Sequence, residues 1–559
     1  MGTLLHILDL NDPVIVGLGF FILVYLVALI IIHGRMSKNE KHKKIWNALC
    51  FVPLLLYSIH IITFVGGDAF IHIFTQFQRV YISAVLIAFL PLFAKKNALR
   101  IIGNIVCVVS CIVHSVLTLD TGKPVDFSDK SKSDAYISLC DFLEENYVLS
   151  EWKKADYEKL KADGLALIDE AEKTGDADKY YDALYMLMDT FRDGHFSVYF
   201  YDSEPYYLID KVAELSDYGL SLLTLDNGDT IAVNVDEGLE IKAGDVITKW
   251  NGVPVDEASE DVDLILNMGT TPEHDKIQKT FFLSATGGDA VDVTYINSDG
   301  KETVATLNRI EGNQQRAGES LGIFTHSDND IYNYRMLNDN IGYLRVVEEV
   351  TDYHTDLISS FTGEHTQARE MFREDLRELR AQGMTKLVID IRYNLGGYDE
   401  ISMALVSLFT NEEMYAYSLG VKNGREIKNV HDKYVKPDGE FSDLEIVVLT
   451  GMRCGSAGDD LAKLLSELPN ATVAGLTDPA GSAQETGGVV YMPGNAAVNF
   501  PVGLILDKNG NPNIDSDHTG KSRNPVDIKI PLDKEAALKI FSGEDYELEW
   551  AMEYLNKME

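Results

Sequence analysis

The sequence is poor in cysteine and in positive charge, and each shortage excludes a class of protein. Its 559 residues hold 5 cysteines, and no two of them form a C-x-x-C pair. Neither a disulfide scaffold nor a structural zinc or thioredoxin-like redox site therefore has local support. Lys and Arg total 49 against 87 Asp and Glu. Because phosphate contacts need a basic face, we expect no nucleic-acid partner.

The charge is unevenly distributed along the chain. Residues 1–119 hold 9 Lys and Arg and 4 Asp and Glu, a net charge of +5. Residues 120–559 have a net charge of −43, and the two parts sum to the −38 of the whole chain. This first fifth contains four apolar runs, at 14–33, 45–65, 80–94 and 101–119. Most of them approach the ~20 residues with which a helix crosses a bilayer. They predict a four-helix transmembrane anchor.

Basic residues in the short loops predict the orientation of this anchor. They cluster between the first and second runs and between the third and fourth. Loops rich in Lys and Arg stay in the cytoplasm, so both termini are expected outside. The sequence therefore predicts a multi-pass protein of the cell membrane with an extracytoplasmic soluble domain.

Apolar periodicity divides the soluble part after a polar linker at 120–133. Helical spacing predicts a helical cap over 134–205, and short strands with Gly and Asn-Gly turns predict a small β domain over 206–312. Alternating strands and helices predict an α/β core over 313–559. Strand-to-helix turns of such a core can hold a site.

A serine between two glycines stands at one of these turns. The buried strand predicted at 444–450 is followed by Gly-Met-Arg-Cys-Gly-Ser456-Ala457-Gly before a helix. Such a turn presents the hydroxyl as a nucleophile and aims backbone N–H groups at developing negative charge. The string resembles a nucleophile elbow, although Cys454 occupies its first glycine position. The alternative is that Ser456 only caps the following helix.

Two further elements carry residues suited to chemistry. Gly396 and Gly397 follow a buried strand in Asp390-Ile-Arg-Tyr-Asn-Leu-Gly-Gly, where glycines let the backbone approach a ligand with free amides. His195 follows Asp-Gly just before a strand, and its ordinary pKa near neutrality suits a general base. Each also has an ordinary structural explanation, as a strand-to-helix turn and as a core histidine.

The small β domain opens with the glycine loop Tyr218-Gly219-Leu220. Such a loop can bind a peptide carboxylate on its amides while the peptide adds to the sheet as an extra strand. We therefore predict peptide binding at these three residues. A β domain without a ligand is the alternative.

The order of these elements resembles that of the C-terminal processing (tail-specific) and tricorn-core serine proteases, over about 133–531. A cap ending in D-G-H is followed by G-D-V-I-x-x-x-N-G, then by D-x-R-x-N-x-G-G, and then by G-S-A before a helix. The resemblance implies a PDZ-like β domain, a crotonase-like (ClpP/crotonase) α/β core and cleavage of peptide bonds. It implies no metal and no organic cofactor.

This family activates its serine in two ways, and the residues present distinguish them. One branch uses a lysine about 25 residues after the serine, but 479–484 holds none. The tricorn-like branch uses a histidine at the position that matches His195. The resemblance thus implies Ser456 as the nucleophile and His195 as its base.

The same resemblance implies the groups that support this pair. The N–H of Ala457 and an N–H of Gly396 or Gly397 are expected to form the oxyanion hole. An acidic residue near the end of the core is expected to orient the imidazole, and the candidates are Asp515 and Asp517.

A rival triad in the chain order of the α/β-hydrolases remains open. It would consist of Ser456, Asp515 and His518. An aspartate only three residues from its histidine is poorly spaced to orient the ring from another loop.

The sequence as a whole predicts a membrane-anchored, extracytoplasmic serine endopeptidase that acts on peptides or proteins. One alternative is a catalytically inactive protein that binds peptides in the PDZ-like groove. Another is an esterase that uses the same serine and histidine. An inactive binding protein would not react with a fluorophosphonate at Ser456. An esterase would hydrolyse small esters but no peptides.

Overall fold

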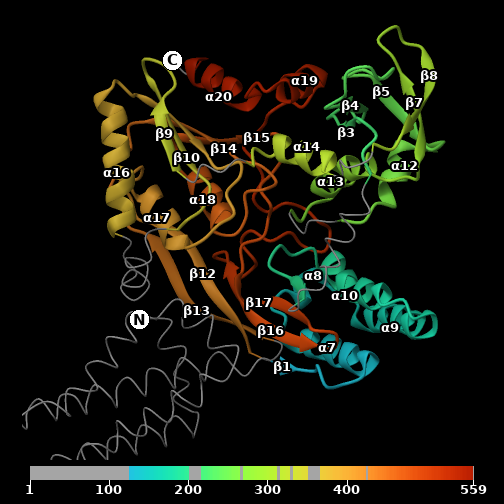
Figure 1. The fold of residues 1–559 in the computed structure, drawn as a ribbon. Coiled ribbons are helices and arrows are strands. Elements are labelled where there is room, and N and C mark those ends of the chain that lie inside the picture. Colours follow the sequence, from blue (N-terminus) through green and yellow to red (C-terminus); the bar gives the residue numbers. More distant parts are fainter. Residues whose placement is uncertain are drawn as a thin grey trace, which may run out of the picture. The chain divides into compact units, whose positions relative to one another are not determined.

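The computed structural model describes residues 125–557, apart from 201–215, 265–268, 311–314, 328–331, 351–365 and 424–425. Within these ranges the chain is a mixed α/β fold of three sheets and the helices packed against them (Figure 1). Val125–Asp352 and Glu364–Glu559 cluster as one compact unit.

The predicted transmembrane anchor needs a correction. No helix of the described residues is long and apolar enough to cross a membrane. The longest of them, α9 (Tyr157–Thr174), carries charged side chains along its length, such as those of Lys161 and Glu172. The four apolar runs of 1–119 lie outside the described residues. The four-helix anchor, the multi-pass membrane location and the extracytoplasmic placement that depended on them are therefore not supported.

The core is a six-stranded sheet in the order β18-β15-β14-β11-β10-β9. Five neighbouring strands are parallel, and β9 runs antiparallel to β10. Apolar runs buried on both faces are typical of such parallel strands. The strands are β9 (Tyr332–Met336), β10 (Ile341–Val346), β11 (Lys386–Asp390), β14 (Glu445–Leu449), β15 (Ala471–Gly475) and β18 (Ile528–Lys529).

Successive side chains of these strands pack against different helices, as the period of two in a strand requires. Leu387 and Ile389 of β11 join the apolar cluster of one face, and Val388 joins that of the other. The first cluster includes the helices α16 (Thr366–Ala381), α17 (Asp399–Ser407) and α18 (Ala457–Ser466), and the second includes α19 (Lys534–Ser542) and α20 (Tyr546–Lys557) (Figure 1).

Parallel pairing of β11 with β14 positions the candidate site. Asp390 is the register partner of Leu449, so the two strands end side by side. The turns that follow them carry the glycine pair at 396–397 and the serine at 456. Ligands of parallel sheets bind at this carboxyl edge.

A second sheet, in the order β1-β16-β17-β12-β13 with β2 beside β17, supports the helical cap. Apolar side chains of the cap helices and of this sheet form one cluster. The strands are β1 (Val125–Asp126), β2 (Ser197–Phe200), β12 (Met414–Asn423), β13 (Glu426–Val435), β16 (Glu485–Met492) and β17 (Ala496–Leu506). The other cap helices are α7 (Lys132–Asn146), α8 (Ser150–Lys153) and α10 (Asp178–Phe191).

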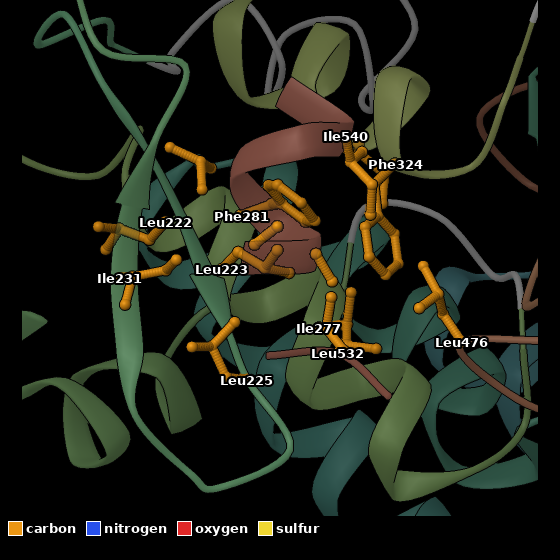
Figure 2. Close-up of a cluster of buried hydrophobic side chains, with 14 of the residues drawn as sticks. Leu222, Leu223, Leu225, Ile231, Ile277, Phe281, Phe324, Leu476, Leu532 and Ile540 are labelled. Carbon is orange, nitrogen blue, oxygen red and sulfur yellow. The ribbon is translucent and has the colours of Figure 1, made fainter. Parts of the chain in front are cut away.

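The third sheet, in the order β3-β4-β5-β7-β8 with β6 beside β5, lies within the range predicted for the small β domain. Figure 2 shows side chains of β3, β4, α13, α14 and α19 meeting in one apolar cluster that also includes Leu476 and Leu532. The elements are β3 (Ser221–Thr224), β4 (Thr230–Val233), β5 (Val246–Trp250), β6 (Val253–Pro254), α12 (Val255–Glu260), α13 (Pro272–Leu283), β7 (Ala290–Ile296), β8 (Glu302–Asn308) and α14 (Arg316–Phe324).

Candidate active site

Ser456 lies in a tight turn between β14 and α18. Its backbone has φ +58° and ψ −128°, a region that costs a non-glycine residue about 1–3 kcal/mol and persists where the surroundings fix it. The Ser456 N–H donates to the carbonyl of Ser482 over 2.8 Å, and the Gly455 N–H donates to the carbonyl of Asn394 over 2.8 Å. Within the described residues the Ser456 side chain makes no capping hydrogen bond to α18.

His195 comes to this serine from a segment 261 residues away. The end of α10 and the start of β2 fix its backbone, and its N–H donates to Oδ1 of Asp193 over 2.9 Å. Nε2 of His195 lies 3.1 Å from Oγ of Ser456. The structure therefore brings together the predicted nucleophile and the predicted base at hydrogen-bond distance.

The surroundings of His195 favour a neutral imidazole. Burial lowers the pKa of His195, and the nearby carboxylate of Asp193 opposes this shift. A neutral ring can accept a proton from a hydroxyl at Nε2. The site can thus perform general-base chemistry near neutral pH.

Sequence reasoning missed the residue that contacts the other ring nitrogen. Nδ1 of His195 lies 2.9 Å from Oγ of Ser482, and this hydroxyl donates to Oδ1 of Asp193 over 3.1 Å. The Gly194 N–H donates to the same hydroxyl over 3.0 Å. In the sequence, the segment around Ser482 shows only that a lysine is absent, whereas the aspartate of D-G-H is a signal for Asp193.

Neither acid predicted to orient His195 forms a hydrogen bond with it among the described residues. Asp515 is buried and accepts from the N–H of Ala483 over 3.3 Å and from the side-chain amide of Gln484. Burial raises the pKa of Asp515 to about 7. Asp517 accepts from the N–H of Thr519 over 2.7 Å instead.

The rival triad is not assembled. His518 is exposed, and its Nε2 lies 3.3 Å from Nζ of Lys154. Ser456 has its hydrogen-bond partner in His195 instead. The α/β-hydrolase order of residues therefore does not correspond to a spatial site here.

Gly396 packs directly against the serine turn. A Cβ atom there would lie 2.3 Å from Cβ of Ser456, and its φ is +89°, so only glycine fits. Its N–H donates to Oδ1 of Asn394 over 2.9 Å and is thus already bonded. The N–H groups of Gly397 and Ala457 have no acceptor among the described residues. Ala457 begins α18, where the helix dipole favours negative charge.

Residues 340–520, which include this turn and Ser482, match the sequence model of peptidase family S41. They form a peptidase family S41 domain. The match assigns the protein to the serine-type peptidases, which are hydrolases, and their substrates are peptides or proteins. His195 lies outside the matched residues, in the cap that precedes the S41 domain.

Solved structures resemble the chain at low identity. Mature CPAF complexed with lactacystin matches with 12% identity over 75% of this chain and 98% of its own, with a TM-score of 0.50. The photosystem II D1 C-terminal processing protease (15%, 75% and 98%, TM-score 0.34) and the tricorn protease (13%, 76% and 36%, TM-score 0.32) match less well. The likeness to CPAF concerns the fold alone. No curated protein matches the chain in sequence.

Two buried carboxyl groups hold the loops around the S41 site. Asp459 accepts from the N–H groups of Gly481 and Ser482, each over 2.9 Å, and Glu349 accepts from the side-chain amide of Asn394 over 2.8 Å. Burial raises the pKa of both Asp459 and Glu349 to about 8. Glu349 therefore fixes the glycine turn after β11, and Asp459 fixes the loop that carries Ser482 against α18.

The predicted peptide-binding loop is engaged in internal contacts. Tyr218 and Leu220 are buried, and the N–H of Gly219 donates to Oδ1 of Asp217 over 2.7 Å. The adjoining strand β3 is buried throughout against α13 and α14, as Figure 2 shows for its leucines. Peptide binding at these three residues stays a prediction.

The described residues also contain no group of three or more His, Cys, Asp or Glu side chains arranged to hold a metal ion. Cys140 and Cys454 are both buried and free. Cys454 lies two residues before Ser456, and burial raises the pKa of its thiol. A protonated thiol is a poor nucleophile, so we do not expect Cys454 to react in this turn.

Proposed function

We propose that the chain is a serine endopeptidase in which Ser456 is the nucleophile and His195 is the general base. The observation that carries this proposal is the 3.1 Å contact between Oγ of Ser456 and Nε2 of His195. Two segments far apart in sequence meet there, at the edge of the sheet where ligands bind. The strained backbone of Ser456 adds support, because such strain is concentrated at functional sites.

The reaction follows from the positions of these atoms. As Oγ of Ser456 bonds to the substrate carbonyl carbon, its proton passes to Nε2 of His195. The imidazolium then returns this proton to the leaving amine, which leaves an acyl-enzyme. Water, deprotonated by the same nitrogen, hydrolyses the ester and restores Ser456.

The oxyanion would be held by the N–H groups of Gly397 and Ala457. Both lack an acceptor among the described residues, whereas the N–H of Gly396 already donates to Asn394. Removal of one such donor typically costs ~3 kcal/mol in the transition state. Of the two glycines that the sequence offered as the second donor, we therefore propose Gly397.

The observations favour this proposal over an inactive peptide-binding protein. That alternative needs an open groove at Tyr218-Gly219-Leu220, where the structure has internal contacts. It also predicts that the catalytic residues no longer contact each other, whereas Ser456 and His195 lie at hydrogen-bond distance.

Casein cleavage by the full-length chain tests the proposal. Wild type and the surface control His518→Ala should degrade casein, and Ser456→Ala and His195→Ala should lose cleavage by at least ~10³-fold. Wild type that hydrolyses a nitrophenyl ester but leaves casein intact would establish an esterase instead. Cleavage that survives Ser456→Ala would overturn the assignment of the nucleophile.

A further inference from the structure

A continuous path of hydrogen bonds extends behind His195, away from Ser456. It runs from Nδ1 of His195 to Oγ of Ser482 over 2.9 Å, and from there to Oδ1 of Asp193 over 3.1 Å. The direct distance from Nδ1 to this carboxylate oxygen is 4.0 Å, which is too long for a hydrogen bond. Ser482 therefore connects the imidazole to the acid.

The direction of each hydrogen bond follows from counting donors. The Asp193 carboxylate accepts the backbone N–H of His195 at Oδ1 over 2.9 Å and the hydroxyl of Tyr147 at Oδ2 over 2.9 Å. Ser482 has one hydroxyl proton, and it donates this proton to Oδ1 of Asp193. The Ser482 oxygen then acts only as an acceptor toward its other neighbours, as it does for the N–H of Gly194.

This direction determines the tautomer of His195. Since the Ser482 oxygen has no proton left to give, Nδ1 of His195 must carry the proton in their shared bond. Nε2 of the neutral ring then carries a lone pair and faces the hydroxyl of Ser456. Only this tautomer can act as a general base toward the serine.

We propose that Ser482 and Asp193 are positioning residues that together hold the neutral His195 in the tautomer protonated at Nδ1. The inference rests on the proposed function and assigns a role that neither predicted acid, Asp515 or Asp517, has the contacts to fill. Ser482 links the Asp193 carboxylate to the ring through hydrogen bonds and forms no bond to the substrate. As the imidazolium forms, the same path stabilises its positive charge.

The fold fixes Ser482 from both sides of its backbone. Its N–H donates to Oδ2 of Asp459 over 2.9 Å, and its carbonyl accepts the N–H of Ser456 over 2.8 Å. Its side chain is 2% exposed, so water does not compete for the hydroxyl. The residue that sets the tautomer is thus bonded directly to the backbone of the nucleophile.

Two other charged groups are close to the acid end of this path. Lys153 and Asp515 both interact electrostatically with Asp193. Nζ of Lys153 donates to the carbonyl of Arg192 over 3.0 Å and to Oγ of Ser516 over 3.2 Å. Both groups stay unchanged in the variants below, so changes in the pH profile report on the path itself.

Steady-state kinetics of the full-length chain on a fluorogenic casein tests the inference. Ser482→Ala should lower kcat by roughly 10- to 100-fold with KM within about twofold of wild type, because the ring loses a charge-assisted bond and not a substrate contact. Ser407→Ala is the matched control. It removes another buried hydroxyl, which among the described residues bonds only to the carbonyl of Ala404 in its own helix, and should retain wild-type kcat.

Asp193→Asn tests the charge at the end of the path. The amide oxygen can still accept from the N–H of His195 and from the hydroxyl of Ser482, but it has no negative charge to stabilise the imidazolium, so kcat should fall by roughly 10- to 100-fold. Asp193 raises the pKa of His195. The acidic limb of kcat/KM in Asp193→Asn should therefore move to lower pH, which a purely structural role would not cause.

The outcomes separate this inference from the proposed function. Loss of activity in Ser456→Ala, together with unchanged kcat and an unchanged acidic limb in Ser482→Ala and Asp193→Asn, would overturn the inference alone. Activity that survives Ser456→Ala would overturn the proposed function. If circular dichroism shows that Asp193→Asn does not fold, Ser482→Ala alone tests the inference. An unchanged kcat together with an unchanged acidic limb of kcat/KM in Ser482→Ala would then refute it.

Discussion

At the scale of single residues, the candidate site depends on how closely the glycine turn approaches the serine turn. Gly396 lies where any side chain would overlap Cβ of Ser456. The N–H of Gly397, the next residue in the chain, has no acceptor among the described residues. A single residue without a side chain thus keeps the proposed nucleophile and one proposed oxyanion donor together.

Gly396→Ala should therefore reduce the rate of fluorophosphonate labelling by at least ~100-fold, since an added methyl displaces Ser456 or the loop. Gly510→Ala is the matched control, because Gly510 also has a positive φ, +81°, but open space around its Cβ position. Both variants should lose about 1 kcal/mol or more of stability through backbone strain, and only the first should lose labelling. Equal labelling of the two variants would contradict the close-contact argument.

At the scale of elements, the strand β11 is tied to the C-terminal helix α20 by a buried ion cluster. Arg392 follows β11 and is 3% exposed, and its guanidinium pairs with Asp390 at 2.7 Å and with Asp545 at 2.6 Å. Burial alone would raise the pKa of Asp390, but Arg392 holds it well below its usual range. The strand that carries the glycine turn is thereby anchored from the far face of the sheet.

Arg392→Gln should lower the free energy of unfolding by about 3–5 kcal/mol, because it leaves buried carboxylates without their cation. Urea denaturation of the full-length chain measures this loss. Arg377→Gln is the control, because its pair with Glu440 is half exposed and should contribute at most about 1 kcal/mol. Similar losses in the two variants would contradict the anchoring role of Arg392.

At the scale of the whole molecule, buried carboxyl groups predict how stability depends on pH. Burial raises the pKa of Glu349 and Asp459 to about 8 and that of Asp515 to about 7, well above the ~4 of an unfolded chain. Between these values the folded state binds more protons than the unfolded state. The stabilisation that these groups contribute is therefore fully present below about pH 4, and it is lost as the pH rises through their folded pKa values.

The melting temperature should accordingly fall between pH 6.5 and 8.5, a window that lies above the pKa of His195 and of the buried His274. Each carboxyl group contributes up to about 1.4 kcal/mol per pH unit. Calorimetry at the two pH values measures the fall. Asp459→Asn removes one titrating group and should show a smaller fall, whereas an identical or larger fall would argue against a raised pKa at Asp459.

The sequence allowed part of this arrangement to be predicted, because part of it depends on local patterns. Strand-to-helix turns at Ser456 and Gly396 follow from apolar runs that end in glycines, and adjacent parallel strands bring them to one edge. The residue type and position of His195 make it a candidate base, but only the resemblance in motif order pairs it with Ser456, since no local pattern links residues 261 apart. The structure brings these predicted residues together.

The remaining features depend on tertiary contacts that leave no periodic signal. Ser482 lies in a loop without a pattern, and its role follows only from its contacts with His195 and Asp193. The place of Asp515 in the chain predicts that it orients His195, but its carboxylate accepts a hydrogen bond from the side-chain amide of Gln484 instead. The glycine loop at 218–220 was predicted to bind a ligand, although the protein's own helices cover the adjoining strand.

The most direct test of the central claim is to map the site of covalent modification. The full-length chain is treated with a fluorophosphonate at pH 7.5, digested and analysed by mass spectrometry. We expect one adduct, on Ser456, that forms at least ~10³-fold more slowly in His195→Ala and at the wild-type rate in His518→Ala. An adduct on another residue, or equal labelling of wild type and His195→Ala, would contradict it.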